Sequence, residues 1–185
     1  INKLDDLKGK KIFTFPTAGR FLSQFGVVPV TLPWEDIEVA MQTGELDGFA
    51  GSGTTEIYTV GWAEVTNYFL TNSISGAWVG SFFANMEKYE ALPENMKGLL
   101  KLAMDSSHYY RQWWYWGGEA AKRVHGTKLK LTTIPDAEWS TVQKAAEKFW
   151  DEIAAESKTK AKVVEIFRKY NADMEKAGPP YRYTC

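Results

Sequence analysis

Apolar positions in the first half of the chain follow the periods of short strands and of an amphipathic helix. The run 27–30 is apolar and bounded by turn residues, which is typical of a buried strand. Ile37, Ala40 and Met41 recur at the i, i+3, i+4 spacing of one helix face. Gly44 can end that helix in a left-handed conformation, and a further strand follows. A strand, a helix and a strand this close together predict a parallel crossover.

The same patterns predict further elements on both sides of this unit. Ile12, Phe13 and Phe15 form a strand that Pro16 ends, and Thr17 is placed as the N-cap of the helix that follows. The other elements expected before residue 134 are helices at 17–25 and 56–65 and strands at 67–70, 77–84 and 129–133.

From Pro93 onward the chain is predominantly helical. Apolar spacing predicts a long helix that extends to about Arg123 and is interrupted or bent at Gly117 and Gly118. Glu119 and Arg123 lie at i, i+4 and predict a surface ion pair.

Two more helices complete the predicted elements. Asp136 is expected to cap the first of them, and the second spans about 159–176. An extended tail follows at 179–185. The first helix carries one apolar stripe, made of Trp139, Val142, Ala146, Phe149, Trp150 and Ile153.

Composition describes a globular α/β protein with an unremarkable charge. The 185 residues are 44% hydrophobic and 24% charged, and the formal net charge of −1 argues against a nucleic-acid partner. No apolar run approaches the ~20 residues of a membrane span. The single cysteine, Cys185, can form neither an intrachain disulfide nor a cysteine metal cluster. Because the chain begins with Ile1 rather than Met, we expect a processed or truncated protein.

Aromatic content and polar chemistry favour binding over catalysis. Aromatic residues reach 15%, including eight Trp, which fits ligand stacking as well as plain packing. His108 and His125 lack an acid or thiol partner at ligand spacing, so no catalytic or metal role is expected for them. The cluster at 109–116, YYRQWWYW, is interpreted as packing of the long helix rather than as a ligand cage.

Three segments in order carry a family resemblance: LKGKKI, then GVVPVTLPWEDIEVAMQTGELDG, and later LPENMKGLL, preceded by Asn85. Together they resemble the substrate-binding proteins of tripartite ATP-independent periplasmic (TRAP) transporters, DctP type. The resemblance implies an α/β, periplasmic binding protein-like (type II-like) fold with two lobes, a long connecting helix and a helical C-terminal region.

Members of this family are longer, so the chain resembles their C-terminal part, and the fold is expected to be incomplete. We expect an α/β ligand-binding lobe with crossing strands at 1–85. The long helix, a short strand and the C-terminal helices, at 86–185, would pack on both lobes. A missing N-terminal lobe segment would leave open strand edges, which we expect a companion chain or a swap partner to cover.

The family usually holds a ligand carboxylate with an arginine on the strand after the first motif, and this chain has Phe13 there. Arg20 is the nearest substitute, expected in the first helical turn beside Thr17, where free N–H groups also favour an anion. The alternative is a solvated Arg20 on a helix surface.

One branch of the family places a metal after the Asp-Gly turn. This chain has Ala50 and Gly51 there, which offer no side-chain oxygen, so no metal and no cofactor are predicted. We expect instead a neutral site of hydroxyl and amide groups, made of Ser52, Thr54, Asn72, Ser73 and Ser75. The alternative is that these are ordinary loop residues.

Trp34, Phe49 and Trp78 are the expected aromatic walls of the site. The resemblance implies capture of an organic acid and its delivery to the membrane subunits of a TRAP permease. Because the charged residues of the family's site are replaced here, an aromatic or branched acid is suggested. It also implies a periplasmic, non-catalytic protein. The alternatives are a sensor or interaction module on the same fold, and an enzyme on a similar α/β scaffold.

Overall fold

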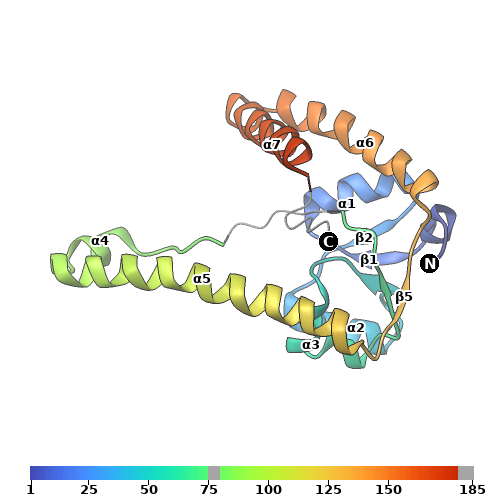
Figure 1. Cartoon of the computed structure of the whole chain (residues 1–185), viewed down its shortest axis with the longest axis horizontal. Coiled ribbons are helices and arrows are strands. Elements are labelled where there is room, and N and C mark those ends of the chain that lie inside the picture. Colours follow the sequence, from blue (N-terminus) through green and yellow to red (C-terminus); the bar gives the residue numbers. More distant parts are fainter. Residues whose placement is uncertain (75–79, 179–185) are drawn as a thin grey trace, which may run out of the picture. The chain divides into compact units, whose positions relative to one another are not determined.

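The computed structural model describes residues 1–74 and 80–178, and the chain divides into two compact units (Figure 1). The first is Ile1–Ile134 and the second Pro135–Cys185. The boundary expected after residue 85 falls inside the first of these units, and the expected division into lobes stays a prediction. The long helix belongs to the same unit as the strands because it packs against helix α3 (Thr54–Thr59).

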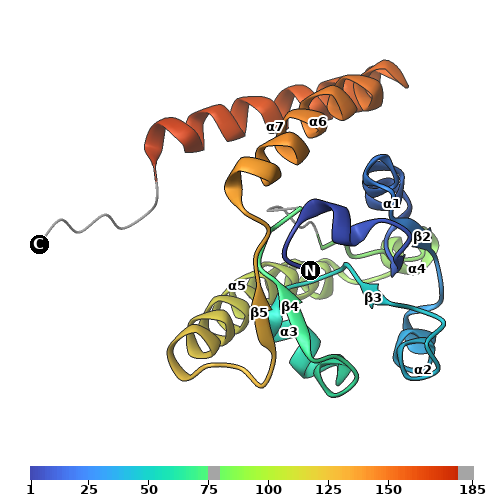
Figure 2. The ribbon, with the colours of Figure 1, turned by 90° about the vertical axis from the view of Figure 1, so that its right-hand side faces the viewer.

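Three short parallel strands form the first sheet, in the order β2-β1-β3, which confirms the predicted crossover (Figure 2). Both outer strands pair with β1 and not with each other. The strands are β1 (Lys11–Phe13), β2 (Val28–Val30) and β3 (Gly48–Phe49).

Short helices connect these strands. Gly44 adopts the predicted left-handed conformation, with φ of 75°, after the second connection. The predicted cap is wrong: the first helix begins at Pro16, with Phe15 at the N-cap and no side-chain cap hydrogen bond. The connecting elements are α1 (Pro16–Leu22), η2 (Ser23–Phe25), η3 (Trp34–Asp36) and α2 (Ile37–Gln42), and η1 (Leu4–Leu7) precedes them.

A second sheet pairs two strands that are distant in sequence, β4 (Tyr68–Leu70) and β5 (Lys130–Thr132), in parallel. The helix predicted at 56–65 is divided instead into α3 (Thr54–Thr59) and η4 (Trp62–Glu64), because Gly61 turns the chain with φ of 86°. The strand predicted at 77–84 is wrong for residues 80–84, which form no strand, while 77–79 lie outside the described residues.

The long helix α5 (Glu94–His125) has 32 residues and spans about 48 Å at 1.5 Å per residue. It continues through Gly117 and Gly118, so the predicted interruption is wrong. The sequence interpretation also missed α4 (Met86–Glu90), which packs beside the start of α5, where the Lys97 ammonium lies over the Tyr89 ring (Figure 1).

The core of the first unit joins both sheets and the helices between them. Its members share nearly complete burial: Phe13, Ile37, Ala40, Leu46, Ile57, Trp62 and Leu129. Ile37 and Ala40 come from the predicted apolar face of the helix, which confirms that part of the pattern.

The second unit is a pair of packed helices, α6 (Asp136–Ala155) and α7 (Lys158–Ala177). The predicted stripe of α6 is confirmed, since all its members are buried or half-buried. Asp136 is the first helical residue and Pro135 takes the N-cap position, so the predicted cap is wrong. Residues of the predicted tail, 179–185, lie outside the described part of the chain.

Candidate functional site

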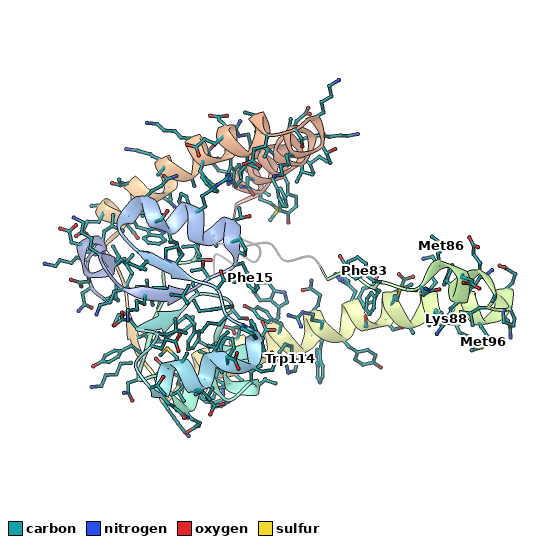
Figure 3. The ribbon with its side chains drawn as sticks, turned by 180° about the vertical axis from the view of Figure 1, so that it is seen from behind. Phe15, Phe83, Met86, Lys88, Met96 and Trp114 are labelled. Atoms are coloured by element: carbon teal, nitrogen blue, oxygen red, sulfur yellow. The ribbon has the colours of Figure 1, made fainter. Side chains whose placement is uncertain are left out.

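Two aromatic rings lie at the carboxyl edge of the first sheet. Phe15 follows β1, Trp34 follows β2, and their rings stack with centroids 6.5 Å apart and 19° between planes. Phe15, labelled in Figure 3, is 53% exposed. Phe13 contacts both rings edge-on from the core and is itself buried. Phe13, at the position where the resemblance implied an arginine, is therefore an apolar support beneath this aromatic pair.

Trp62 joins two of the predicted wall residues. Its ring lies 4.3 Å from that of Trp34 and 4.7 Å from that of Phe49, centroid to centroid. Trp62 is buried, whereas Trp34 and Phe49 are half-buried. The structure thus brings Trp34 and Phe49 into one cluster, which the sequence interpretation had left without Trp62 and Phe15.

The loop after β3 passes beside this cluster. The Ala50 amide donates to the carbonyl of Phe13 at 2.8 Å, which continues the sheet. A Cβ on Gly51 would lie 4.0 Å from the ring of Trp34. Ser52 then donates a hydrogen bond to Oε2 of Glu56. The loop therefore approaches Trp34 at Gly51, and its next residue, Ser52, is hydrogen-bonded to the carboxylate of Glu56.

Helix α5 holds the end of this loop through one carboxylate. Oε2 of Glu119 accepts a hydrogen bond from the Thr54 hydroxyl at 2.9 Å, and Oε1 accepts one from the Thr55 amide at 2.6 Å. Both threonines are buried. Gly118 makes the close packing feasible, because a Cβ there would overlap the Thr55 side chain. The Thr54 hydroxyl thus helps to hold α3 against α5, and its predicted ligand contact stays a prediction.

A second contact from α5 reaches the same loop. Nη2 of Arg111 lies 3.3 Å from Oε1 of Glu56, and the guanidinium also lies over the Trp114 ring. Burial raises the pKa of the Tyr115 hydroxyl, and the nearby charges of Glu119 and Glu56 raise it further. The loop end therefore lies in a polar network with two carboxylates and one guanidinium.

Thr17 and Arg20 lie on α1, and both are exposed. Arg20 is in the last turn of this helix and not in the first turn as predicted. The free N–H groups of a helix N-terminus therefore do not assist it, and the C-terminal end of a helix dipole favours the arginine itself rather than a ligand anion. The structure removes the helix-terminus argument for an anion site at Arg20.

Asn72 has a structural partner. Its side-chain amide donates to the carbonyl of Ile134 at 3.0 Å, and its Oδ1 accepts from the Ile134 amide at 2.7 Å. This reciprocal pair closes the end of the second sheet. Ser73 is exposed, and Ser75 and Trp78 lie outside the described residues.

An open apolar surface lies along α5 and is formed by Ser106, Tyr109, Tyr110 and Trp113. Its three aromatic side chains are 70–78% exposed, so they do not pack against the described part of the chain. The interpretation of this cluster as packing agrees better with Trp114 and Tyr115, which are half-buried.

No helix within residues 1–74 and 80–178 is both long and apolar enough to cross a membrane. No group of three or more His, Cys, Asp or Glu side chains in those ranges could hold a metal ion.

A stacked aromatic pair and a polar loop lie at the carboxyl edge of a parallel sheet, which is where α/β proteins commonly bind small ligands. Residues 1–157 match the family model of the bacterial extracellular solute-binding proteins, family 7 (DctP). The chain belongs to this family, and the predicted TRAP-type membership, periplasmic binding protein-like fold and periplasmic location are confirmed.

Solved structures agree with this assignment. The chain matches all of its length to 58% of a TRAP periplasmic solute-binding protein from Chromohalobacter salexigens, with 72% identity and a TM-score of 0.93. That crystal structure contains (S)-(+)-2-amino-1-propanol. A second solved structure is a TRAP periplasmic solute-binding protein from Pseudoalteromonas atlantica with bound sodium and pyruvate. It is 20% identical to this chain, and the two superpose with a TM-score of 0.69 over 96% of this chain and 57% of the Pseudoalteromonas protein. That likeness shows the fold alone.

A curated relative is more distant. The ectoine-binding periplasmic protein TeaA of Halomonas elongata is 28% identical over 115 residues, which are 58% of this chain and 32% of TeaA. The chain therefore spans about a third of TeaA in that match and 58% of the solved relative.

Proposed function

We propose that the protein captures a small organic solute and delivers it to the membrane subunits of a TRAP-type transporter, without catalysis. The observation that carries this proposal is the stacked Phe15–Trp34 pair at the carboxyl edge of the sheet beside loop 50–54, in which Phe15 is exposed and Trp34 is half-buried. Pockets for small molecules commonly combine such aromatic faces with a few placed polar groups. Closure of two lobes on the solute would be a population shift that ligand contacts favour.

The ligand class is the finer part of the proposal. Two classes fit the residues near the loop: a small amine that carries a hydroxyl, and an organic acid. The amine is supported by the 2-amino-1-propanol in the 72% identical relative and by Phe13, which removes the usual arginine. The acid, aromatic or branched, is supported by the Arg111 guanidinium at 3.3 Å from Glu56, beside Ser52.

A companion segment is the second finer part. The outer strands β2 and β3 of the first sheet pair only with β1 among the described residues. The backbone N–H and C=O groups on their outer edges can therefore pair with another strand or be covered by another chain. We propose that a companion chain or a swapped segment covers them.

Isothermal titration calorimetry on the full natural protein tests solute capture at this edge. The panel contains 2-amino-1-propanol, pyruvate and an aromatic acid. We expect Phe15→Ala to weaken the solute that binds by about tenfold or more, because it removes one exposed face of the stacked pair. Tyr170→Ala on α7 is the control, since Tyr170 is similarly exposed at 59%. Equal binding by Phe15→Ala and the unmodified protein would contradict the proposed site.

A further inference from the structure

We propose that Glu56 gives this site a preference for a protonated amine, with its carboxylate accepting hydrogen bonds from the ammonium group of the ligand. The inference rests on the proposed solute site and names the residue that would bind the positive charge of the solute. It assigns Arg111 and Ser52 as positioning residues for that carboxylate.

The contacts of Glu56 fix its carboxylate without saturating it. Ser52 donates to Oε2, and Nη2 of Arg111 lies 3.3 Å from Oε1. An ionised carboxylate offers about four lone-pair sites, so these two donors leave room for about two more. The Glu56 side chain keeps 25% of its surface exposed, so a small ligand can reach it.

Among the described side chains of this network, carboxylates outnumber cations. Glu56 and Glu119 each bring a carboxylate, and Arg111 brings one guanidinium. Burial is the first cause of the raised pKa of the Tyr115 hydroxyl, and the charges of Glu119 and Glu56 raise this pKa further. Phe13 adds no positive charge at the position where the family has arginine.

The aromatic pair supplies a second kind of recognition. An ammonium group is attracted to the face of a Trp or Phe ring when it lies within about 6 Å. A Cβ on Gly51 would lie 4.0 Å from the Trp34 ring, and Ser52 is the next residue along the chain. A compact amine with a hydroxyl carries one group for the Glu56 carboxylate and one for the Ser52 hydroxyl, and the proposal adds the neighbouring aromatic rings as a further contact.

The test compares two ligands that differ in one group, the ammonium of 2-amino-1-propanol and the neutral hydroxyl that replaces it in 1,2-propanediol, by calorimetry on the full natural protein. Glu56→Gln keeps the size of the side chain and removes its charge. We expect it to weaken the amine by about 10-fold to 100-fold, since a hydrogen bond to a charged group is lost, and to change the diol little. The matched control is Glu64→Gln on η4, whose carboxylate pairs with Lys128 at the surface.

A purely structural role for Glu56 would weaken both ligands equally, and that result would overturn the inference. An unchanged affinity for the amine in Glu56→Gln would overturn it as well. Arg111→Gln tests the positioning role: weaker binding of the amine with little change for the diol supports the inference, because the Glu56 carboxylate loses one of the donors that fix it. An unmodified protein that binds the acid and not the amine would contradict it.

Failure of the proposed function has a different signature. If the unmodified protein binds neither an amine nor an acid, both proposals fall. If binding depends on Phe15 and not on Glu56, only the role of Glu56 is contradicted. Thermal unfolding of each variant identifies any loss of binding that comes from unfolding.

Discussion

At the scale of single residues, the loop beside the candidate site depends on a glycine for close approach. Gly53 lies against the Tyr115 hydroxyl and the Glu119 carboxylate, and a Cβ at Gly53 would overlap the hydroxyl. Its backbone also hydrogen-bonds to Tyr115. The sequence interpretation treated this glycine as part of a loop, and only the packing of α5 reveals why a side chain does not fit.

We therefore predict that Gly53→Ala destabilises the protein by about 1–3 kcal/mol, because the loop or Tyr115 must move to admit a methyl group. Chemical denaturation measures this change in the free energy of unfolding. Gly51→Ala is the matched control, since the nearest atom to its Cβ would be 4.0 Å away. Adding Tyr115→Phe to Gly53→Ala should recover part of the loss, and no recovery would argue against the hydroxyl as the obstacle.

At the scale of elements, local signals predicted β2, the following helix and Gly44, because each depends on residues within one turn or strand. The network at the loop has no such signal. Glu119 contacts Thr54 across 65 residues and Arg111 contacts Glu56 across 55. Helical spacing predicted a pair between Glu119 and Arg123, whose side chain lies outside the described part of the structure, and it gave no signal for the contacts of the Glu119 carboxylate with Thr54 and Thr55. Tertiary packing thus decided the candidate site. Trp34 and Phe49, two of the predicted walls, both contact Trp62, and their role in binding stays a prediction.

Glu119 is predicted to be the main link between α3 and α5. In Glu119→Gln the charge is lost and the amide has only one oxygen to accept both hydrogen bonds, which costs about 1–3 kcal/mol. We expect faster hydrogen exchange at the Thr55 amide, which donates directly to this carboxylate. Glu94→Gln on the same helix is the control, because the Glu94 side chain is 88% exposed. Unchanged exchange at Thr55 would show that other contacts hold the loop.

At the scale of the whole molecule, the first half of α5 exposes more apolar surface than a helix of a soluble protein usually does. Leu99, Leu102, Tyr109 and Trp113 are 57–78% exposed. Figure 3 labels Phe83, Met86 and Met96 around the α4 end of the same helix, and these side chains are also exposed. The chain spans 58% of the solved relative that is 72% identical to it. The other residues of a protein of that length are available to cover such a face.

We predict that the companion segment proposed for the strand edges also covers this face in the full natural protein. Leu102→Ala should then cost about 2–5 kcal/mol of unfolding free energy, because it would remove a buried side chain and leave a cavity. A Leu102 that stays in water would give a change within about 0.5 kcal/mol instead. Val39→Ala on α2 is the control, since Val39 is 59% exposed in the structure and Leu102 61%. Native mass spectrometry of the same sample identifies whether a second chain supplies the cover, because a covering segment of the same chain leaves the mass monomeric.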